Sequence, residues 1–227
     1  RVIFQGFTRK EAIEDAMKAV AWETHVVGGV TPGRDGMHPM LDTLPVFLTV
    51  SAAVRRLKPD GTAIYGPPDE VAAAIEEASN RGRNSAHCAS TGITHGGHVS
   101  IYFMLQSQSK SRLLGGSMPG ILSPSTRFCV GFQPFPCFMP GSVGIVAKSR
   151  RLTYEVAALL TRAGLGQSFC IVGGNVVVGT GFVDALDALE QDPDTDSIIV
   201  IGDHQGRAEE IAAEWTQDYR NRIGDPK

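Results

Sequence analysis

The chain has 227 residues, of which 42% are hydrophobic and 20% charged, and its formal net charge is −3. This composition is ordinary for a globular protein with one large domain or two smaller ones, and the small negative charge excludes bulk attraction to nucleic acid or to an anionic membrane. No apolar run approaches the roughly 20 residues of a membrane-spanning helix. Its four cysteines include no C-x-x-C pair, which favours free thiols in a reducing compartment.

Short β-branched runs alternate with helical patterns in the first half of the chain. A buried strand at residues 2–4 is followed by Thr8 and Glu11, which have the spacing of a capping box and predict a helix that runs to residue 21. A second helix is expected from residue 69 to residue 78. Strands separated by helices of this length predict βαβ units and a parallel sheet. The further strands of this half are expected at residues 25–27, 45–47, 62–65, 85–88 and 112–114.

The alternation of strands and helices ends near residue 121. The stretch 132–140 carries three prolines that suit neither a helix nor a central strand. We therefore predict a linker at 123–140 between a first domain at 1–122 and a second at 141–227. The second domain is expected to have strands at 143–146, 169–172 and 198–201 and helices at 152–163, 182–189 and 208–219. Three strands are few for a parallel sheet, so either the given chain lacks a tail or a partner completes the second sheet.

Several segments together resemble the alpha subunit of succinyl-CoA synthetase, a member of the ADP-forming acyl-CoA ligases. They follow the family's order and spacing from Arg1 to about Trp215. They are Gln-Gly-Phe-Thr at 5–8, Val-Gly-Gly-Val-Thr-Pro-Gly at 27–33, Leu-Pro-Val-Phe at 44–47, Val-Gly-Ile-Val at 143–146, Leu-Thr-Tyr-Glu at 152–155, Gly-Leu-Gly-Gln-Ser at 164–168, Ile-Val-Ile-Gly at 199–202 and Ala-Glu-Glu at 208–210.

The resemblance implies an α/β protein with a Rossmann-like CoA-binding domain followed by a flavodoxin-like ligase domain that is truncated relative to the family. In the family the first domain binds CoA, the second carries a transiently phosphorylated histidine, and a separate beta subunit supplies the nucleotide site. That histidine lies in a Gly-His-Ala-Gly loop, which does not occur among these 227 residues. If the given chain is complete, the phosphohistidine route is closed.

Two segments are expected to hold the CoA phosphates. Gly6 and Thr8 match the family's first turn, where bare backbone meets phosphate at a helix N-terminus. Arg9 and Ala12 stand where the family has further glycines. Arg9 either binds a phosphate through its charge or belongs to a solvated helix start. Arg34 replaces a CoA-contacting lysine, and it either binds phosphate or lies in an exposed Pro-Gly turn.

Two more segments depart from the family near the presumed reaction centre. His95 and His98 follow a strand end, where open α/β sheets bind ligands, so they are candidate catalytic or ligand-binding residues. The alternative is a polar loop, and no carboxylate or cysteine at ligand spacing accompanies them, so no metal is predicted. Ser117 and Met118 replace an asparagine and a cysteine that lie near the CoA thiol in the family.

The second domain contributes charged candidates. The family's phosphate-cradling loop becomes Lys148-Ser149-Arg150-Arg151, which loses a glycine but gains positive charge, and it is either an anion site or a structural loop. Asp203 matches a glutamate that contacts the active histidine in the family. His204, next to it, is a further candidate, although sequence neighbours usually point in different directions.

Three functions stay open. The first is a diverged enzyme that acts on a CoA thioester or a carboxylated metabolite in a biosynthetic pathway, with arginines that hold a carboxylate and a histidine that moves a proton. The second is a working alpha subunit with a ligase beta subunit, and the third a non-catalytic protein that binds CoA or a ligase partner. CoA is the expected cofactor, a homo-oligomer or a beta-like subunit the expected partner, and the cytoplasm or mitochondrial matrix the expected compartment.

Overall fold

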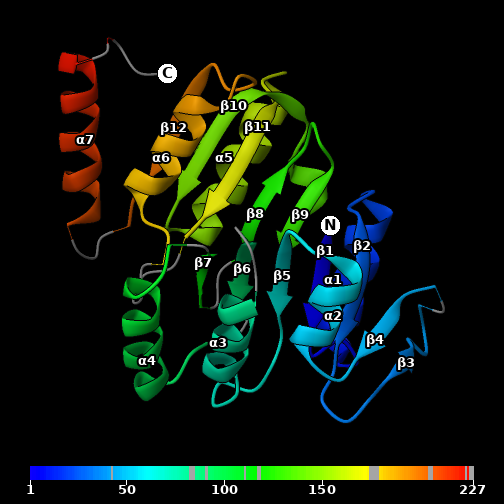
Figure 1. The fold of residues 1–227 in the computed structure, drawn as a ribbon. Helices are drawn as coiled ribbons and strands as arrows, with labels where there is room; N and C mark the ends of the chain where they lie inside the picture. The colour runs from blue at the N-terminus through cyan, green and yellow to red at the C-terminus, as the bar shows by residue number, and fades with distance from the viewer. Residues whose placement is uncertain are drawn as a thin grey trace.

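The structure is a computed structural model that describes all residues except 42, 82–84, 90–91, 110, 117–118, 174–178, 204–206, 223 and 225–227; the side chains of residues 81, 85–89, 95, 116 and 222 also lie outside the described part. The described elements form two α/β units, each built on its own sheet and one above the other in Figure 1.

The first unit is built on a seven-stranded sheet in the order β3-β4-β2-β1-β5-β6-β7. All neighbouring strands are parallel except β3 and β4. The central strands β1 and β5 are buried at every residue, as strands covered on both faces must be. The seven strands are β1 (Val2–Gln5), β2 (Val26–Val30), β3 (Gly36–Met37), β4 (Pro45–Phe47), β5 (Gly61–Ile64), β6 (Ser85–Ala89) and β7 (Ser111–Gly116).

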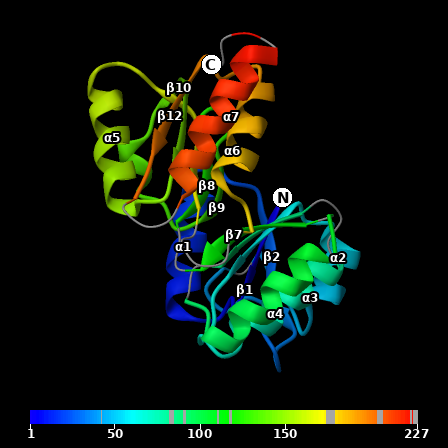
Figure 2. The same ribbon diagram turned by 90° about the vertical axis from the view of Figure 1, so that its left-hand side faces the viewer.

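Four helices cover this sheet on both faces. Figure 2 shows α1 on one face and α2, α3 and α4 on the other, which is the arrangement of a doubly wound fold. The residues of α1 that are buried are alanines, so the helix packs closely on the strands. The four helices are α1 (Lys10–Ala21), α2 (Val50–Leu57), α3 (Val71–Arg81) and α4 (His95–Gln106).

The second unit has a five-stranded sheet in the order β12-β10-β11-β8-β9. The strands β12, β10 and β11 are parallel, whereas β8 and β9 form an antiparallel hairpin that joins the sheet beside β11. Helix α5 covers one face, and α6 and α7 lie on the other (Figure 2). The elements are β8 (Gly120–Ser123), β9 (Phe128–Gly131), the 3₁₀ helix η1 (Phe135–Cys137), β10 (Pro140–Ala147), α5 (Arg150–Arg162), β11 (Gln167–Val172), α6 (Phe182–Gln191), β12 (Ser197–Ile201) and α7 (Ala208–Arg222).

One hydrophobic core joins the two units. Phe4 of β1, Val130 of β9, Val146 of β10 and Ile171 of β11 belong to a single cluster of buried side chains. The hairpin strand β9 also contacts β5 and β6 of the first sheet, and it contacts α1. The second unit therefore packs directly on the first through the hairpin.

The expected parallel sheets are confirmed, and three local expectations are corrected. Thr8 does not cap α1: the N-cap is Arg9, and the Thr8 hydroxyl donates to Thr31 Oγ1 at 3.5 Å. Residues 95–98, for which a polar loop was one of the alternatives, form the first turn of α4, which Thr94 caps by accepting from the Gly97 N–H at 3.2 Å. The stretch expected as a linker includes β9, a strand of the second sheet, so the boundaries at 122 and 141 stay a proposal.

No helix of the described residues is both long and apolar enough to cross a membrane.

Candidate functional site

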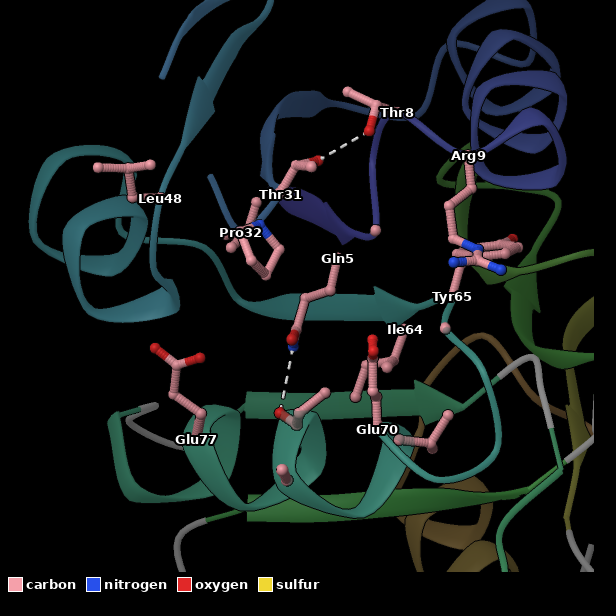
Figure 3. Close-up of a pocket in the computed structure, with 16 residues that line it drawn as sticks. Gln5, Thr8, Arg9, Thr31, Pro32, Leu48, Ile64, Tyr65, Glu70 and Glu77 are labelled. Carbon is pink, nitrogen blue, oxygen red and sulfur yellow. Dashed lines mark hydrogen bonds between the residues drawn. The ribbon is translucent and has the colours of Figure 1, made fainter. Parts of the chain in front are cut away.

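A cleft opens at the carboxyl ends of β1, β2 and β5, the place where open parallel sheets bind ligands. Its volume is about 390 Å³, and Figure 3 shows its side chains. Thr8 and Thr31 lie on one side of the cleft, and Glu70 and Glu77 of the α3 region lie on the other. The cleft is large enough for part of a cofactor, and its walls come from α3 and from the segments that follow β1, β2, β4 and β5.

The turn after β1 exposes bare backbone to this cleft. Gly6 has φ +68°, a conformation that side chains disfavour, and a Cβ at this position would overlap the carbonyl oxygen of Tyr65. The next two residues, Thr8 and Arg9, also line the cleft. Glycine is therefore required here, and its bare backbone lies open to a ligand in the cleft.

Arg9 is the cationic residue of this turn. Its side chain lies beside Tyr65 in Figure 3, and it forms no ion pair with any described residue. Arg34, predicted as a second phosphate ligand, is exposed on the loop after β2 and does not line the cleft. Arg9 thus remains available for an anion, whereas Arg34 lies outside the cavity.

Carboxylates lie across the cleft from Arg9. Glu77 accepts a hydrogen bond from the Val50 N–H at 2.9 Å, so it stabilises the first turn of α2 while lining the cavity. Glu70 precedes α3 and is exposed. The cleft therefore has a side that suits an anion, at Gly6 and Arg9, and a side that suits hydrogen-bond donors, at Glu70.

A second group of charges lies where β10 and β12 end. The Lys148 side chain is only 11% exposed; its ammonium lies 3.6 Å from Glu209 Oε1 and 5.4 Å from the centre of the Phe182 ring. Glu209 Oε1 also accepts from the Asp203 N–H at 2.9 Å. This backbone hydrogen bond, together with Lys148, lowers the pKa of Glu209 below its ordinary value. The ammonium of Lys148 is therefore engaged within the protein.

The cavity beside Lys148 has a volume of only about 30 Å³. That is room for about one water molecule. The residues that line it include Lys148, Thr180 and Phe182, and the Thr180 hydroxyl is buried without a hydrogen-bond partner among the described residues. A substrate does not fit into this cavity as it stands.

The first turn of α5 offers two further cations of the second unit. Arg151 is exposed and its Nε lies 3.0 Å from Glu155. Arg150 lies over the Phe132 ring at 5.9 Å and lines an open cleft of about 540 Å³ between α1, η1 and α5. Tyr154 lines the same cleft, and burial raises the pKa of its phenol well above the ordinary value.

The structure brings the predicted residues together in two groups and leaves others apart. Gly6, Thr8 and Arg9 meet in the first cleft. Lys148, Ser149, Arg150, Arg151 and Asp203 lie near the ends of β10 and β12. His98 is half-buried on α4 and lines none of the three cavities described above.

Some candidates lie outside the described part of the chain. They are Ser117, Met118, His204 and the side chain of His95. Among the described residues, no group of three or more His, Cys, Asp or Glu side chains could hold a metal ion. The roles assigned to these residues from the sequence stay predictions.

Sequence reasoning missed several residues that shape the first cleft: Gln5, Tyr65, Glu70, Glu77 and, behind the cleft, His38. Gln5 ends β1 and its amide donates to Ala74 O of α3 at 3.5 Å. Its place directly before Gly6 is a signal that could have identified it.

Comparison with known proteins agrees with this geometry. The CoA binding domain family matches residues 1–92, which contain the turn at Gly6 and most of the first sheet. The chain is 38% identical over 224 residues to succinate–CoA ligase [ADP-forming] subunit alpha 1 of Archaeoglobus fulgidus, covering 98% of this chain and 76% of that protein. It is 36% identical over 219 residues to the Aquifex aeolicus alpha subunit, covering 96% and 71%.

Solved structures show the same fold at lower identity. ATP citrate lyase from Methanothrix soehngenii has a TM-score of 0.80 at 16% identity, covering 97% of this chain and 38% of that one. An acetyl-coenzyme A synthetase from Ca. Korarchaeum cryptofilum has a TM-score of 0.74 at 19% identity, covering 95% and 48%. The chain spans less than half the length of either of these structures.

The fold is that of a two-unit α/β protein, and its first unit matches the CoA binding domain family. Within that class, the chain belongs to the family of succinate–CoA ligase [ADP-forming] alpha subunits.

Proposed function

We propose that this chain is a CoA-binding component of an acyl-CoA ligase-type enzyme that acts on a CoA thioester or a carboxylated metabolite. The observation that carries the proposal is the open cleft beside Gly6, where a glycine with positive φ exposes backbone and Arg9 adds a positive charge. These residues fit a coenzyme with phosphates, because backbone N–H groups and a guanidinium are both good phosphate ligands. CoA supplies the thiol that accepts or releases the acyl group.

The protein's own residues would then bind and orient this coenzyme. Gly6 and Thr8 form the backbone surface against which a diphosphate lies, and Arg9 neutralises its charge. Glu70 offers an acceptor on the opposite side. The carboxylated substrate is assigned to Arg150, which faces an open cleft, rather than to Lys148, whose ammonium is already engaged by Glu209. The proton carrier remains a prediction from the sequence, with His95, His98 and His204 as its candidates.

Titration calorimetry with CoA and with dephospho-CoA tests whether the chain binds the coenzyme. Arg9→Gln is expected to weaken CoA binding about 10- to 100-fold, because a charge-assisted hydrogen bond is worth about 1.5–3 kcal/mol. Lys10→Gln is the matched control: it removes the same charge one residue away, from an exposed side chain that lies 3.9 Å from Glu14 and does not line the cleft. Equal loss in both variants would mean that only net charge matters. Absence of binding to the unmodified chain would refute the proposal.

A second candidate is a working alpha subunit that pairs with a ligase beta-type subunit. It is favoured by the identity of 38% that extends over 98% of this chain. Arg9, Arg150 and Arg151 stand where the family has smaller residues, and this replacement favours a diverged enzyme over a working alpha subunit. The two differ in whether ATP and a beta-type subunit leave a phosphate adduct on the chain, which intact-mass measurement detects.

A further inference from the structure

His38 is a histidine with almost no exposed surface, and it lies behind the first cleft rather than in it. It is 1% exposed and lies in the loop from β2 to β4, directly after the two-residue strand β3 that this loop contains. Its ring packs on the Phe7 ring at 4.5 Å between centroids, and Phe7 is fully buried. A polar ring in such a place must satisfy both nitrogens, because an unpaired buried polar atom costs about 1–3 kcal/mol.

Both ring nitrogens do have partners, and those partners fix the tautomer. Nε2 lies 2.9 Å from the carbonyl oxygen of Phe7, which can only accept a hydrogen bond. Nδ1 lies 3.2 Å from the Met40 N–H and 3.1 Å from the Leu41 N–H, which can only donate. The ring therefore carries its proton on Nε2 and accepts at Nδ1.

These hydrogen bonds connect two segments that form the cleft. Phe7 lies between Gly6 and Thr8, both of which line the cavity, so the bond to its carbonyl holds the turn after β1. His38 belongs to the loop that begins with Thr31 and Pro32, which line the same cavity. The far end of this loop is held by a hydrogen bond from the His38 N–H to Leu44 O at 2.9 Å.

We propose that His38 is a positioning residue for the coenzyme cleft: as the Nε2–H tautomer it holds the Gly6–Thr8 turn against the loop after β2. The assignment of the cleft to CoA rests on the proposed function, whereas the mechanical link between the two segments does not. His38 touches no ligand in this scheme. It acts through the Phe7 carbonyl, which sets the orientation of the peptide units on either side of it.

Two conservative substitutions separate the two halves of this link. In His38→Asn the side-chain oxygen replaces Nδ1 as an acceptor for the Met40 and Leu41 N–H groups, but the donor to Phe7 is lost. In His38→Gln the amide nitrogen replaces Nε2 as a donor to Phe7, but the acceptor is lost. We expect CoA to bind about tenfold more weakly to His38→Asn and within about threefold of the unmodified chain to His38→Gln.

Two further measurements distinguish a loss of positioning from a general loss of stability. Nitrogen NMR of the histidine rings is expected to show His38 protonated at Nε2 only, the signal being identified by its disappearance in His38→Asn. Hydrogen exchange is expected to accelerate at the Arg9 amide, which donates to Gly6 O at 2.9 Å, in His38→Asn but not in His38→Gln. Leu189→Ala, on the buried face of α6, is the control for general destabilisation and should leave CoA affinity unchanged.

The outcomes decide the proposal in every case. A proton on Nδ1, or equal CoA affinity and equal exchange in the two His38 variants, overturns it. If the unmodified chain binds no CoA, the proposed function fails. Hydrogen exchange at the Arg9 amide still tests the role of His38 in that case. Faster exchange confined to His38→Asn supports the link between the Gly6–Thr8 turn and the loop after β2, and unchanged exchange refutes it.

Discussion

At the scale of single residues, the cleft depends on backbone that a side chain would obstruct. Gly6 and Gly33 both have positive φ, +68° and +78°, and they flank the same region of the chain. They differ in their surroundings: a Cβ on Gly6 would overlap the Tyr65 carbonyl, whereas nothing lies within 4 Å of a Cβ on Gly33. The two glycines therefore allow the cost of a left-handed backbone to be separated from the cost of a clash.

We expect Gly33→Ala to lower the free energy of unfolding by only about 1 kcal/mol, which is the cost of a left-handed alanine. Gly6→Ala should cost at least about twice as much, because the turn must also move away from Tyr65, and it should abolish CoA binding. Urea denaturation and titration calorimetry measure the two effects. Similar destabilisation in both variants would show that the turn can relax around a methyl group.

Sequence reasoning found the residues of this site that stand next to one another in the chain. Gly6, Thr8 and Arg9 could be predicted because they follow a strand in the family's order. It missed His38 and Glu77, since the Phe7 carbonyl to which His38 donates and the Val50 N–H from which Glu77 accepts are 31 and 27 positions away. No local pattern indicates that a histidine accepts from one loop and donates to another.

At the scale of the elements, the sequence predicted most strands and helices but missed α2, α4, β3 and the hairpin β8–β9. Helix α4 was missed because Gly96 and Gly97 are typical of a loop, yet Thr94 caps the helix and Ile101 anchors it in the core. The hairpin β8–β9 was missed because its four-residue strands precede a proline-rich stretch, and only pairing with β11 defines it as part of the sheet. Tertiary packing decided both elements.

Helix α7 is joined to the second sheet by a small network of charges. Glu209, in its first turn, accepts from the Asp203 N–H and lies 3.6 Å from the Lys148 ammonium. Because the pKa of Glu209 is lowered in the folded protein, its stabilising contribution is complete above the ordinary glutamate value of about 4.3. That contribution is lost as the pH falls from this value through the lower pKa of the folded state.

We therefore expect Glu209→Gln to be less stable than the unmodified chain at neutral pH, by no more than about 1 kcal/mol since the pair is partly exposed. The difference should shrink as the pH falls below about 4. Urea denaturation at several pH values measures it. Glu210→Gln is the control, because Glu210 forms only an exposed ion pair with Arg207. A difference between Glu209→Gln and the unmodified chain that is constant across this range would contradict the network.

At the scale of the whole molecule, the end of α1 connects the two units. Trp22 follows α1, and its ring stacks on the Phe135 ring of η1 at 4.7 Å between centroids. Arg127 lies on the turn of the β8–β9 hairpin, and its guanidinium is 5.0 Å from the centre of the Trp22 ring. Thr24 donates to Arg127 O at 2.8 Å. Trp22 thus joins the first unit to two segments of the second, in addition to the core that both sheets share.

The Trp22 indole offers a comparison that tests this junction. Its Nε1 is buried without a hydrogen-bond partner among the described residues, so the N–H group adds a desolvation cost and no bond. Trp22→Phe keeps the stacking ring and loses this group, and we expect it to change the free energy of unfolding by less than about 1 kcal/mol. Trp22→Ala removes the ring from a half-buried site and should cost about 2–3 kcal/mol, somewhat below the range for fully buried rings.

Because the two units share a core, the loss in Trp22→Ala should appear as a shift of one cooperative transition in urea rather than as a separate transition of the first unit. Fluorescence and circular dichroism, recorded through the same denaturation, distinguish these cases. In the double variant of Trp22→Ala with Phe135→Ala, the loss in free energy of unfolding should be smaller than the sum of the two single losses, since each substitution removes the same stacked pair. Two transitions would show that the units fold independently, and additive losses would show that the ring pair does not couple them.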